Sequence, residues 1–190
     1  MQLLRAAGHK RMPWKNGKGE TAEIAVFPEG APLGEFGWRL SMATVVEPGP
    51  FSAFPEIDRV LAIVSGGGLQ LDIGGRDIIV SREGKALAFP GDVTVASFPF
   101  GTPVIDLNLM TRRGQFQGSI TRVRGETATV ITPKALTFVV ALADCTLTTD
   151  VQSVALKYQD AVRLEVRDRP VTLQATGGLE LLVVSISAEA

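Results

Sequence analysis

A chain of 190 residues is long enough to bury a sizeable core, as one large domain or as two fused small modules. Hydrophobic residues make up 45% of the chain and charged residues 21%, a balance that excludes an intrinsically disordered protein. Nineteen Lys and Arg against twenty Asp and Glu leave a net charge of -1, which offers no electrostatic footprint for nucleic acid or for an anionic membrane.

The sequence contains few features that would indicate targeting or redox chemistry. The sequence has no segment of signal-peptide type and no run of about 18 apolar residues, so we expect a cytoplasmic protein. The single cysteine, Cys145, excludes an internal disulfide and a cysteine-rich zinc site. It lies in an apolar run and is interpreted as a buried, inert thiol.

Short segments of strand character cover the first half of the chain and are separated by turns rich in Gly and Pro. The clearest alternation lies in LQLDI, where three apolar residues face one way and Gln70 and Asp72 face the other. No long helical pattern occurs, and only residues 111–118 leave room for a helical turn or two. The segments of this half are 38–46, 59–65, 69–73, 77–81, 86–89, 93–97 and 104–110.

The second half repeats this rhythm in segments 136–147, 154–158, 161–167, 171–175 and 179–187. Four segments align between the halves at a steady offset of about 75–78 residues. Short strands at this spacing are typical of sandwiches and barrels. The sequence therefore predicts an all-β fold of two tandem jelly-roll-like β-barrels packed as one globular unit. We expect the first half at about residues 12–118 and the second at about 119–190.

The supply of ligand residues limits the chemistry. His9, the one histidine, lies in a polar stretch and is interpreted as a solvated residue. A site of two histidines and a carboxylate cannot be built from one histidine. A Ser-His-Asp triad is not expected, because no candidate serine has a histidine in its strand neighbourhood. The glycines of GGGLQLDIGG join strands and open no helix, so no phosphate-binding loop is present. We expect no metal, no cofactor and no assignable catalytic residue.

The first of three polar segments, MPWKNGKGETAEI, covers residues 12–24. It contains Trp14 and Asn16, followed by Thr21 and Glu23 on one face of a strand. An edge hairpin with a solvated polar face explains the same pattern, and that alternative stays open.

The second segment opens with the strand WRLSMATVV. Arg39 and Ser41 share one face of it, opposite Trp38.

In the same segment Phe51 and Ser52 form a loop before Arg59, which begins an apolar strand. A guanidinium presents a planar fork that matches a carboxylate. Arg59 is therefore either an anion clamp or a solvated strand end.

The third segment is VIDLNLMTRRG, in which Asp106 and Asn108 fall on one face of a strand. Both faces of this strand look buried, and a buried Asp or Asn without a hydrogen bond costs about 1–3 kcal/mol. The pair is either satisfied within the protein or lines a cavity in the mouth of the barrel.

PWKNGKGETAEI, WRLSMATVVEPGPFSAFPEIDR and DLNLMTRRG together resemble the HutD/Ves family in order and spacing, from residue 12 to about residue 114. The chain departs from the family pattern at Lys18 and Glu56. The resemblance implies a bicupin fold and a regulatory role in histidine utilisation, without an established catalytic activity.

By position in these motifs, the resemblance also implies a ligand site. Its residues are Asn16, Ser52, Arg59, Asp106 and Asn108, with Arg39 and Ser41 in the WRLS motif. The implied ligand is a small anionic metabolite, a carboxylate such as urocanate or formylglutamate.

Three functions stay open. The first is a metal-free binding protein in which Arg59 holds a carboxylate and Phe51, Phe54 and Trp38 form apolar walls. The second is a metal-free isomerase or hydrolase with Asp106 or Glu23 as general base, because a barrel interior raises the pKa of a carboxylate. The third is a protein–protein interaction module. A homodimer is also left open.

Overall fold

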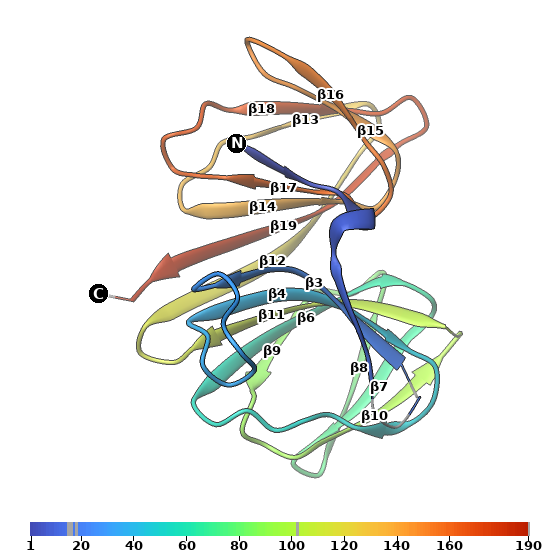
Figure 1. Cartoon of the computed structure of the whole chain (residues 1–190). Coiled ribbons are helices and arrows are strands. Elements are labelled where there is room, and N and C mark those ends of the chain that lie inside the picture. The colour runs from blue at the N-terminus through green and yellow to red at the C-terminus, as the bar shows by residue number, and fades with distance from the viewer. Residues whose placement is uncertain (15–16, 18, 102, 190) are drawn as a thin grey trace. The chain divides into compact units, whose positions relative to one another are not determined.

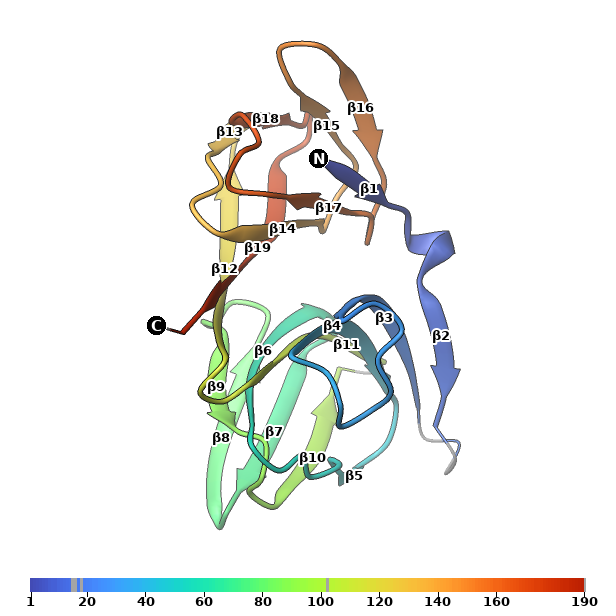
Figure 2. The ribbon, with the colours of Figure 1, turned by 60° about the vertical axis from the view of Figure 1, so that its left-hand side comes forward.

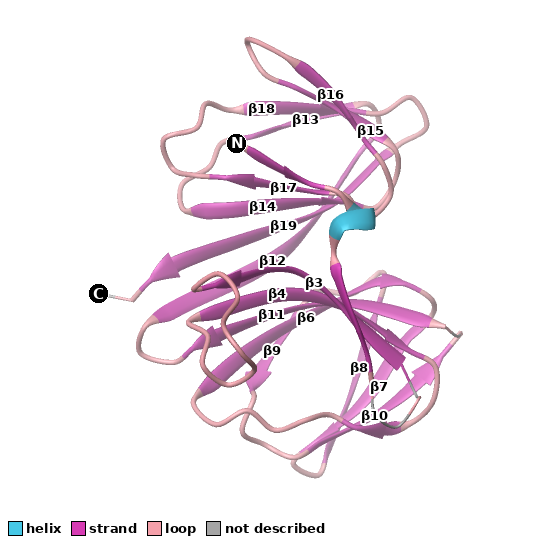
Figure 3. Ribbon diagram, in the orientation of Figure 1, coloured by secondary structure: helices cyan, strands magenta, loops and turns pink. Residues whose placement is uncertain are grey.

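The computed structural model describes residues 1–14, 17, 19–101 and 103–189, which form two compact units (Figure 1). Strands make up almost all of the regular structure, which confirms the all-β prediction (Figure 3). Within the described residues the one helix is the 3₁₀ turn η1 (Ala6–Gly8). Residues 111–118, which left room for a helical turn, are the end of one strand, a turn and the start of the next.

The N-terminal unit consists of Lys10–Ser119 and the last residues of the chain from Ala188. It contains two antiparallel sheets (Figure 2). The order of the six-stranded sheet is β2 (Lys10–Pro13), β3 (Gly19–Phe27), β4 (Trp38–Val45), β11 (Val104–Arg112), β6 (Ile57–Ser65) and β9 (Leu87–Pro90). The order of the four-stranded sheet is β5 (Gly49–Pro50), β10 (Val95–Phe100), β7 (Gly68–Ile73) and β8 (Arg76–Ser81).

The core of this unit lies between its two sheets. Val45, Leu61 and Ile63 from the larger sheet pack in one buried cluster with Leu69 and Leu71 from the smaller one. Alternation along each strand sends these side chains inward and their neighbours outward. The apolar cluster fills one part of the interior, and polar residues of β4, β6 and β11 face the remainder.

The C-terminal unit consists of Met1–His9 and Ile120–Ser187. One sheet has the order β1 (Gln2–Leu4), β17 (Ala161–Leu164), β14 (Leu136–Ala141), β19 (Leu179–Ala188) and β12 (Phe116–Gly125). The other has the order β13 (Ala128–Ile131), β18 (Val171–Gln174), β15 (Cys145–Thr148) and β16 (Ser153–Leu156). Its core is aliphatic and joins both sheets, with Val139, Leu164 and Leu181 packed against Leu147 and Leu173.

The two units repeat one arrangement of strands. In the first unit β11, β6 and β9 are consecutive neighbours, and in the second β19, β14 and β17 are. These are the strands that the offset of about 75–78 residues pairs in the sequence. The smaller sheets correspond as well, since β10–β7–β8 matches β18–β15–β16. Each unit is thus a jelly-roll-like pair of facing sheets rather than a fully closed barrel.

The start of the chain belongs to the C-terminal unit. β1 pairs with β17, and the buried Asp160 fixes the residues that follow. Its carboxylate accepts hydrogen bonds from Ala6 N at 2.8 Å and Arg5 Nη1 at 2.6 Å. The interpretation of His9 as solvated is wrong: His9 follows the 3₁₀ turn directly and is buried. In the described part of the chain, no helix has the length and apolar character to span a membrane.

Candidate functional site

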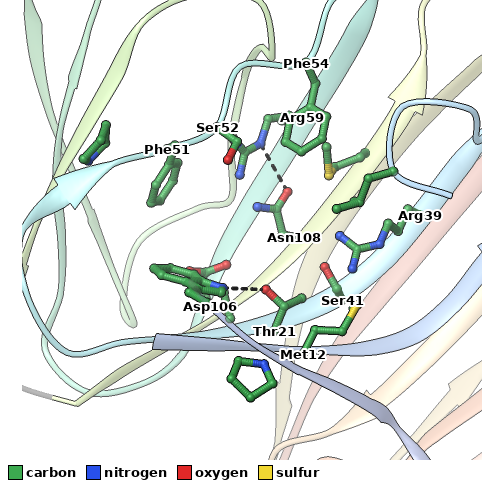
Figure 4. Close-up of a pocket in the computed structure, with 16 residues that line it drawn as sticks. Met12, Thr21, Arg39, Ser41, Phe51, Ser52, Phe54, Arg59, Asp106 and Asn108 are labelled. Carbon is green, nitrogen blue, oxygen red and sulfur yellow. Dashed lines mark hydrogen bonds between the residues drawn. The ribbon is translucent and has the colours of Figure 1, made fainter. Parts of the chain in front are cut away.

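A cavity of about 510 Å³ opens on the inner face of the six-stranded sheet of the N-terminal unit (Figure 4). Its floor comes from β4, β6 and β11, and the loop of residues 51–54 lies on one side. Of the predicted site residues, those lining it are Arg39, Ser41, Phe51, Ser52, Arg59, Asp106 and Asn108. Asn16 lies outside the described residues. The other lining residues are Met12, Pro13, Trp14, Thr21, Leu33, Ala43, Pro50, Phe54 and Met110.

Strand register explains why residues from three segments meet here. Met110 on β11 lies opposite Arg39 on β4 and opposite Arg59 on β6. Residues directly opposite each other in antiparallel strands project to the same face. One row across the sheet therefore carries both guanidinium groups. The next row places Ser41 beside Asn108.

Arg59 is 6% exposed and lies among aromatic rings. Its guanidinium carbon is 4.9 Å from the ring centre of Phe51 and 5.2 Å from that of Phe89. Its Nε donates to Asn108 Oδ1 at 3.4 Å, the one side-chain hydrogen bond it makes to a described residue. Burial lowers the pKa of Arg59 to about 10, against the raising effect of Asp106, so it stays charged at neutral pH. The remaining N–H donors are available to an anion in the cavity.

Asp106 lies one row beyond Asn108, in the row of Ala43 and Ile63, and is fully buried. Its neighbours across the two adjacent strands are Ala43 and Ile63, neither of which has a polar side chain. Neither carboxyl oxygen has a hydrogen-bond partner among the described residues. Burial raises the pKa of Asp106 to about 7, although the charge of Arg59 acts in the opposite direction. Arg59 and Asp106 thus influence each other electrostatically without forming an ion pair within 4 Å in the described structure.

Among the described residues, Arg39 has an acidic hydrogen-bond partner, whereas the side-chain partner of Arg59 is the neutral Asn108. Its Nε donates to Glu23 Oε2 at 2.7 Å, and both side chains are largely buried. This pair neutralises one of the two guanidinium groups beside the cavity. Glu23, a candidate general base by sequence, is therefore engaged with Arg39 in this structure.

The loop over the cavity is fixed at both ends by backbone hydrogen bonds. Phe51 N donates to Val95 O at 2.9 Å, and Phe54 N donates to Gly91 O at 2.7 Å. The Phe54 ring contacts the buried Phe36, with ring centres 6.4 Å apart. The loop therefore holds Ser52 and Phe51 at the cavity without help from a ligand.

The expected apolar wall is only partly as the sequence suggested. Phe51 and Phe54 line the cavity, but Trp38 does not. Trp38 projects to the opposite face of β4 and stacks on Phe27 with ring centres 5.9 Å apart. Trp14 lines the cavity instead and forms an aromatic wall. Its Nε1 donates a hydrogen bond to Thr21 Oγ1 at 2.9 Å. The alternation in WRLS places Trp38 on the face opposite Arg39, and this pattern already argues against Trp38 as a wall of the cavity.

Few residues of the chain are suited to hold a metal ion. Among the described residues no group of three or more His, Cys, Asp and Glu side chains comes together. Cys145 is buried in the C-terminal unit, and burial raises the pKa of its thiol to about 11. Among the described residues, the ionisable side chains that line the cavity are those of Arg39, Arg59 and Asp106.

Comparison with known proteins identifies relatives along nearly the whole chain. The HutD family model matches residues 6–183. An uncharacterized 21.2 kDa protein in the hutC 3′ region of Pseudomonas putida is 34% identical over 184 residues, which cover 93% of each chain. Protein Ves of Cronobacter sakazakii is 36% identical over 124 residues, 63% of this chain and 66% of its own.

Solved structures give the same picture. A conserved protein of unknown function from Pseudomonas aeruginosa PAO1 matches with a TM-score of 0.87 and 30% identity over 98% of both chains. HutD from Pseudomonas fluorescens SBW25 matches with a TM-score of 0.79 and 27% identity, over 100% of this chain and 99% of its own. A cupin 2 conserved barrel domain protein from Leptotrichia buccalis has a TM-score of 0.60 at 10% identity, over 94% of this chain and 96% of its own. That last likeness concerns the fold alone and confirms the cupin type.

Proposed function

Because the chain belongs to the HutD family, we propose that it binds a small carboxylate metabolite in the cavity of its N-terminal unit and thereby modulates histidine utilisation. The observation that carries this proposal is the position of Arg59. A buried guanidinium with most of its N–H donors unused by described residues lines a cavity of about 510 Å³. That volume lies in the range typical of small-molecule sites.

In this proposal Arg59 binds the carboxylate and its neighbours orient the rest of the ligand. The guanidinium fork binds both oxygens, and Phe51 and Phe89 hold the fork in place by contact with its face. The hydroxyl groups of Ser41 and Ser52 supply further hydrogen bonds. Family membership favours urocanate or formylglutamate as the ligand, and the cytoplasm is the location that we propose.

Calorimetric titration with urocanate and with formylglutamate tests the proposal. Arg59→Lys keeps the positive charge but loses the planar fork, so we expect carboxylate binding to weaken about ten- to a hundred-fold. Arg113→Lys is the matched control, since Arg113 pairs with Asp58 and Asp92 at an exposed site and lines no part of the cavity. The proposal is contradicted if neither compound binds, or if the Arg59→Lys variant binds them with the same affinity as the parent protein.

A second candidate function rests on Asp106. A buried carboxyl with a pKa of about 7, at the wall of a cavity, is suited to act as a general base in an isomerase or hydrolase. Turnover of urocanate or formylglutamate, monitored by absorbance and by mass, separates this function from binding alone. Conversion that is lost in Asp106→Asn supports the enzyme, and an unchanged compound after prolonged incubation excludes it for these substrates.

A further inference from the structure

Binding of a carboxylate by Arg59 does not by itself explain why an acidic residue, Asp106, is buried at the same cavity. Asp106 is fully buried, lines the cavity, and has no hydrogen-bond partner for either oxygen among the described residues. Buried polar groups in folded proteins are nearly always paired, because an unpaired one costs about 1–3 kcal/mol or more. The carboxyl group therefore has no partner among the described residues, and a ligand in the cavity can supply one only if the side chains that cover these oxygens give way.

The surroundings of Asp106 favour its neutral form. The flanking side chains of Ala43 and Ile63 donate no hydrogen bond, and an ionised carboxylate without donors is strongly disfavoured in an apolar site. The pKa of about 7 agrees with this reading, because it lies far above the ordinary value of 3.8. A protonated carboxyl group has an O–H donor to offer as well as an acceptor.

The charges that face Asp106 come from three strands. β6 contributes Arg59, and β4 contributes Arg39, whose charge is balanced by Glu23 on β3. The parts of β2 and of loop 50–54 that line the cavity carry no ionisable side chain in the described residues. Arg59 is thus the main charge that stabilises ionised Asp106, and an anion bound to Arg59 cancels that stabilisation.

We infer that Asp106 determines ligand specificity in its protonated form, donating its O–H to the carboxylate that Arg59 binds, so that anion binding takes up one proton. This inference rests on the proposed function. The proton moves from solvent or buffer to the Asp106 carboxylate, and no covalent bond of the ligand changes. A carboxylate ligand held by Arg59 and Asp106 together has donors on both of its oxygens.

The test uses cinnamate, a planar monocarboxylate whose charge is constant between pH 6 and pH 9. Below the pKa of Asp106 the site is ready for the anion, and above it each pH unit removes about a factor of ten in affinity. We expect cinnamate binding to weaken up to about a hundred-fold from pH 6 to pH 9. Calorimetry at pH 8 in Mops and in Tris, which differ in heat of ionisation, should report uptake of about one proton for each anion bound.

Two variants complete the experiment. Asp106→Asn keeps a donor without a charge, so it should bind cinnamate at pH 9 at least ten-fold more tightly than the parent protein and without pH dependence. Asp77→Asn, at an exposed position of β8, should keep the pH dependence of the parent. Affinity that is independent of pH with no proton uptake, or a loss of binding in Asp106→Asn that retains its fold, overturns the inference while leaving the proposed function standing. Absence of carboxylate binding at every pH overturns both. If Asp106→Asn does not fold, the proton uptake of the parent protein decides the question.

Discussion

Arg39 on β4 and Glu23 on β3 form an ion pair beside the cavity, with Arg39 Nε 2.7 Å from Glu23 Oε2. Arg39 is 7% exposed at its side chain and Glu23 is 15% exposed, so water screens the pair only weakly. Removing one partner of such a pair leaves a buried charge uncompensated.

We therefore expect Glu23→Ala to lower the free energy of unfolding by about 3 kcal/mol, measured by urea denaturation. Glu20→Ala is the control on the same strand, because Glu20 pairs with Arg11 at a more exposed site. That change should cost less than about 1 kcal/mol. Equal losses in the two variants would show that burial does not strengthen the Arg39 pair.

Asp106 should make the stability of the fold depend on pH. Its pKa is about 7 in the folded protein and near 3.8 when unfolded, so the folded state binds more protons between these values. Stability from this group is complete below about pH 4 and is lost as the pH rises through about 7. Asp106→Asn removes this dependence and should gain about 3–4 kcal/mol over the parent on going from pH 4 to pH 8. Denaturation curves of both proteins at several pH values measure the difference, and a constant difference contradicts the assignment.

Gly19 allows the close approach of Trp14 to the sheet. A Cβ at residue 19 would clash with the carbonyl oxygen of Thr44 and lie 3.0 Å from the Trp14 ring. Gly19→Ala should lower stability by about 1–3 kcal/mol and weaken carboxylate binding, because the Trp14 wall must move. Gly49→Ala, where a Cβ meets nothing within 4 Å, should change neither quantity appreciably. Thermal unfolding and calorimetry measure the two effects, and wild-type values for Gly19→Ala would refute the steric argument.

Glu56 occupies a left-handed backbone conformation with φ of 60°, in the turn where the chain departs from the family pattern. A residue with a side chain pays about 1–2 kcal/mol there, which glycine avoids. Glu56→Gly should therefore stabilise the protein by about 0.5–1 kcal/mol, after the entropy cost of glycine in the unfolded chain. The ion pair lost with Arg112 is exposed on the Glu56 side and contributes little. Glu35→Gly, at an exposed turn without positive φ, should instead destabilise, and a loss of stability in Glu56→Gly contradicts the strain argument.

Alternation along single strands predicted a large part of the site. A period of two placed Arg39 with Ser41 and Asp106 with Asn108, and the structure has these pairs on the cavity face. The meeting of Arg39 and Arg59 across Met110 depends on the register of three strands that are distant in sequence.

Other features depend on tertiary geometry that a local pattern does not contain. Trp14 reaches the cavity because Gly19 leaves room for its ring, and no periodicity encodes that contact. The sequence left open whether Asp106 is satisfied inside the protein. The answer follows from its cross-strand neighbours Ala43 and Ile63, which the register alone identifies.

The pairing of β1 with β17 has a consequence for biosynthesis. Arg5 and Asp160, which fix this end of the chain, are 155 residues apart in sequence. At a translation rate of about 5–20 residues per second, the first strand waits about 8–30 s on the ribosome before its partner is made. The N-terminal unit, which is built almost entirely from Lys10–Ser119, can close during that interval. β1 is made long before β17 and is therefore among the last strands to reach its native place, exposed meanwhile to chaperones and proteases.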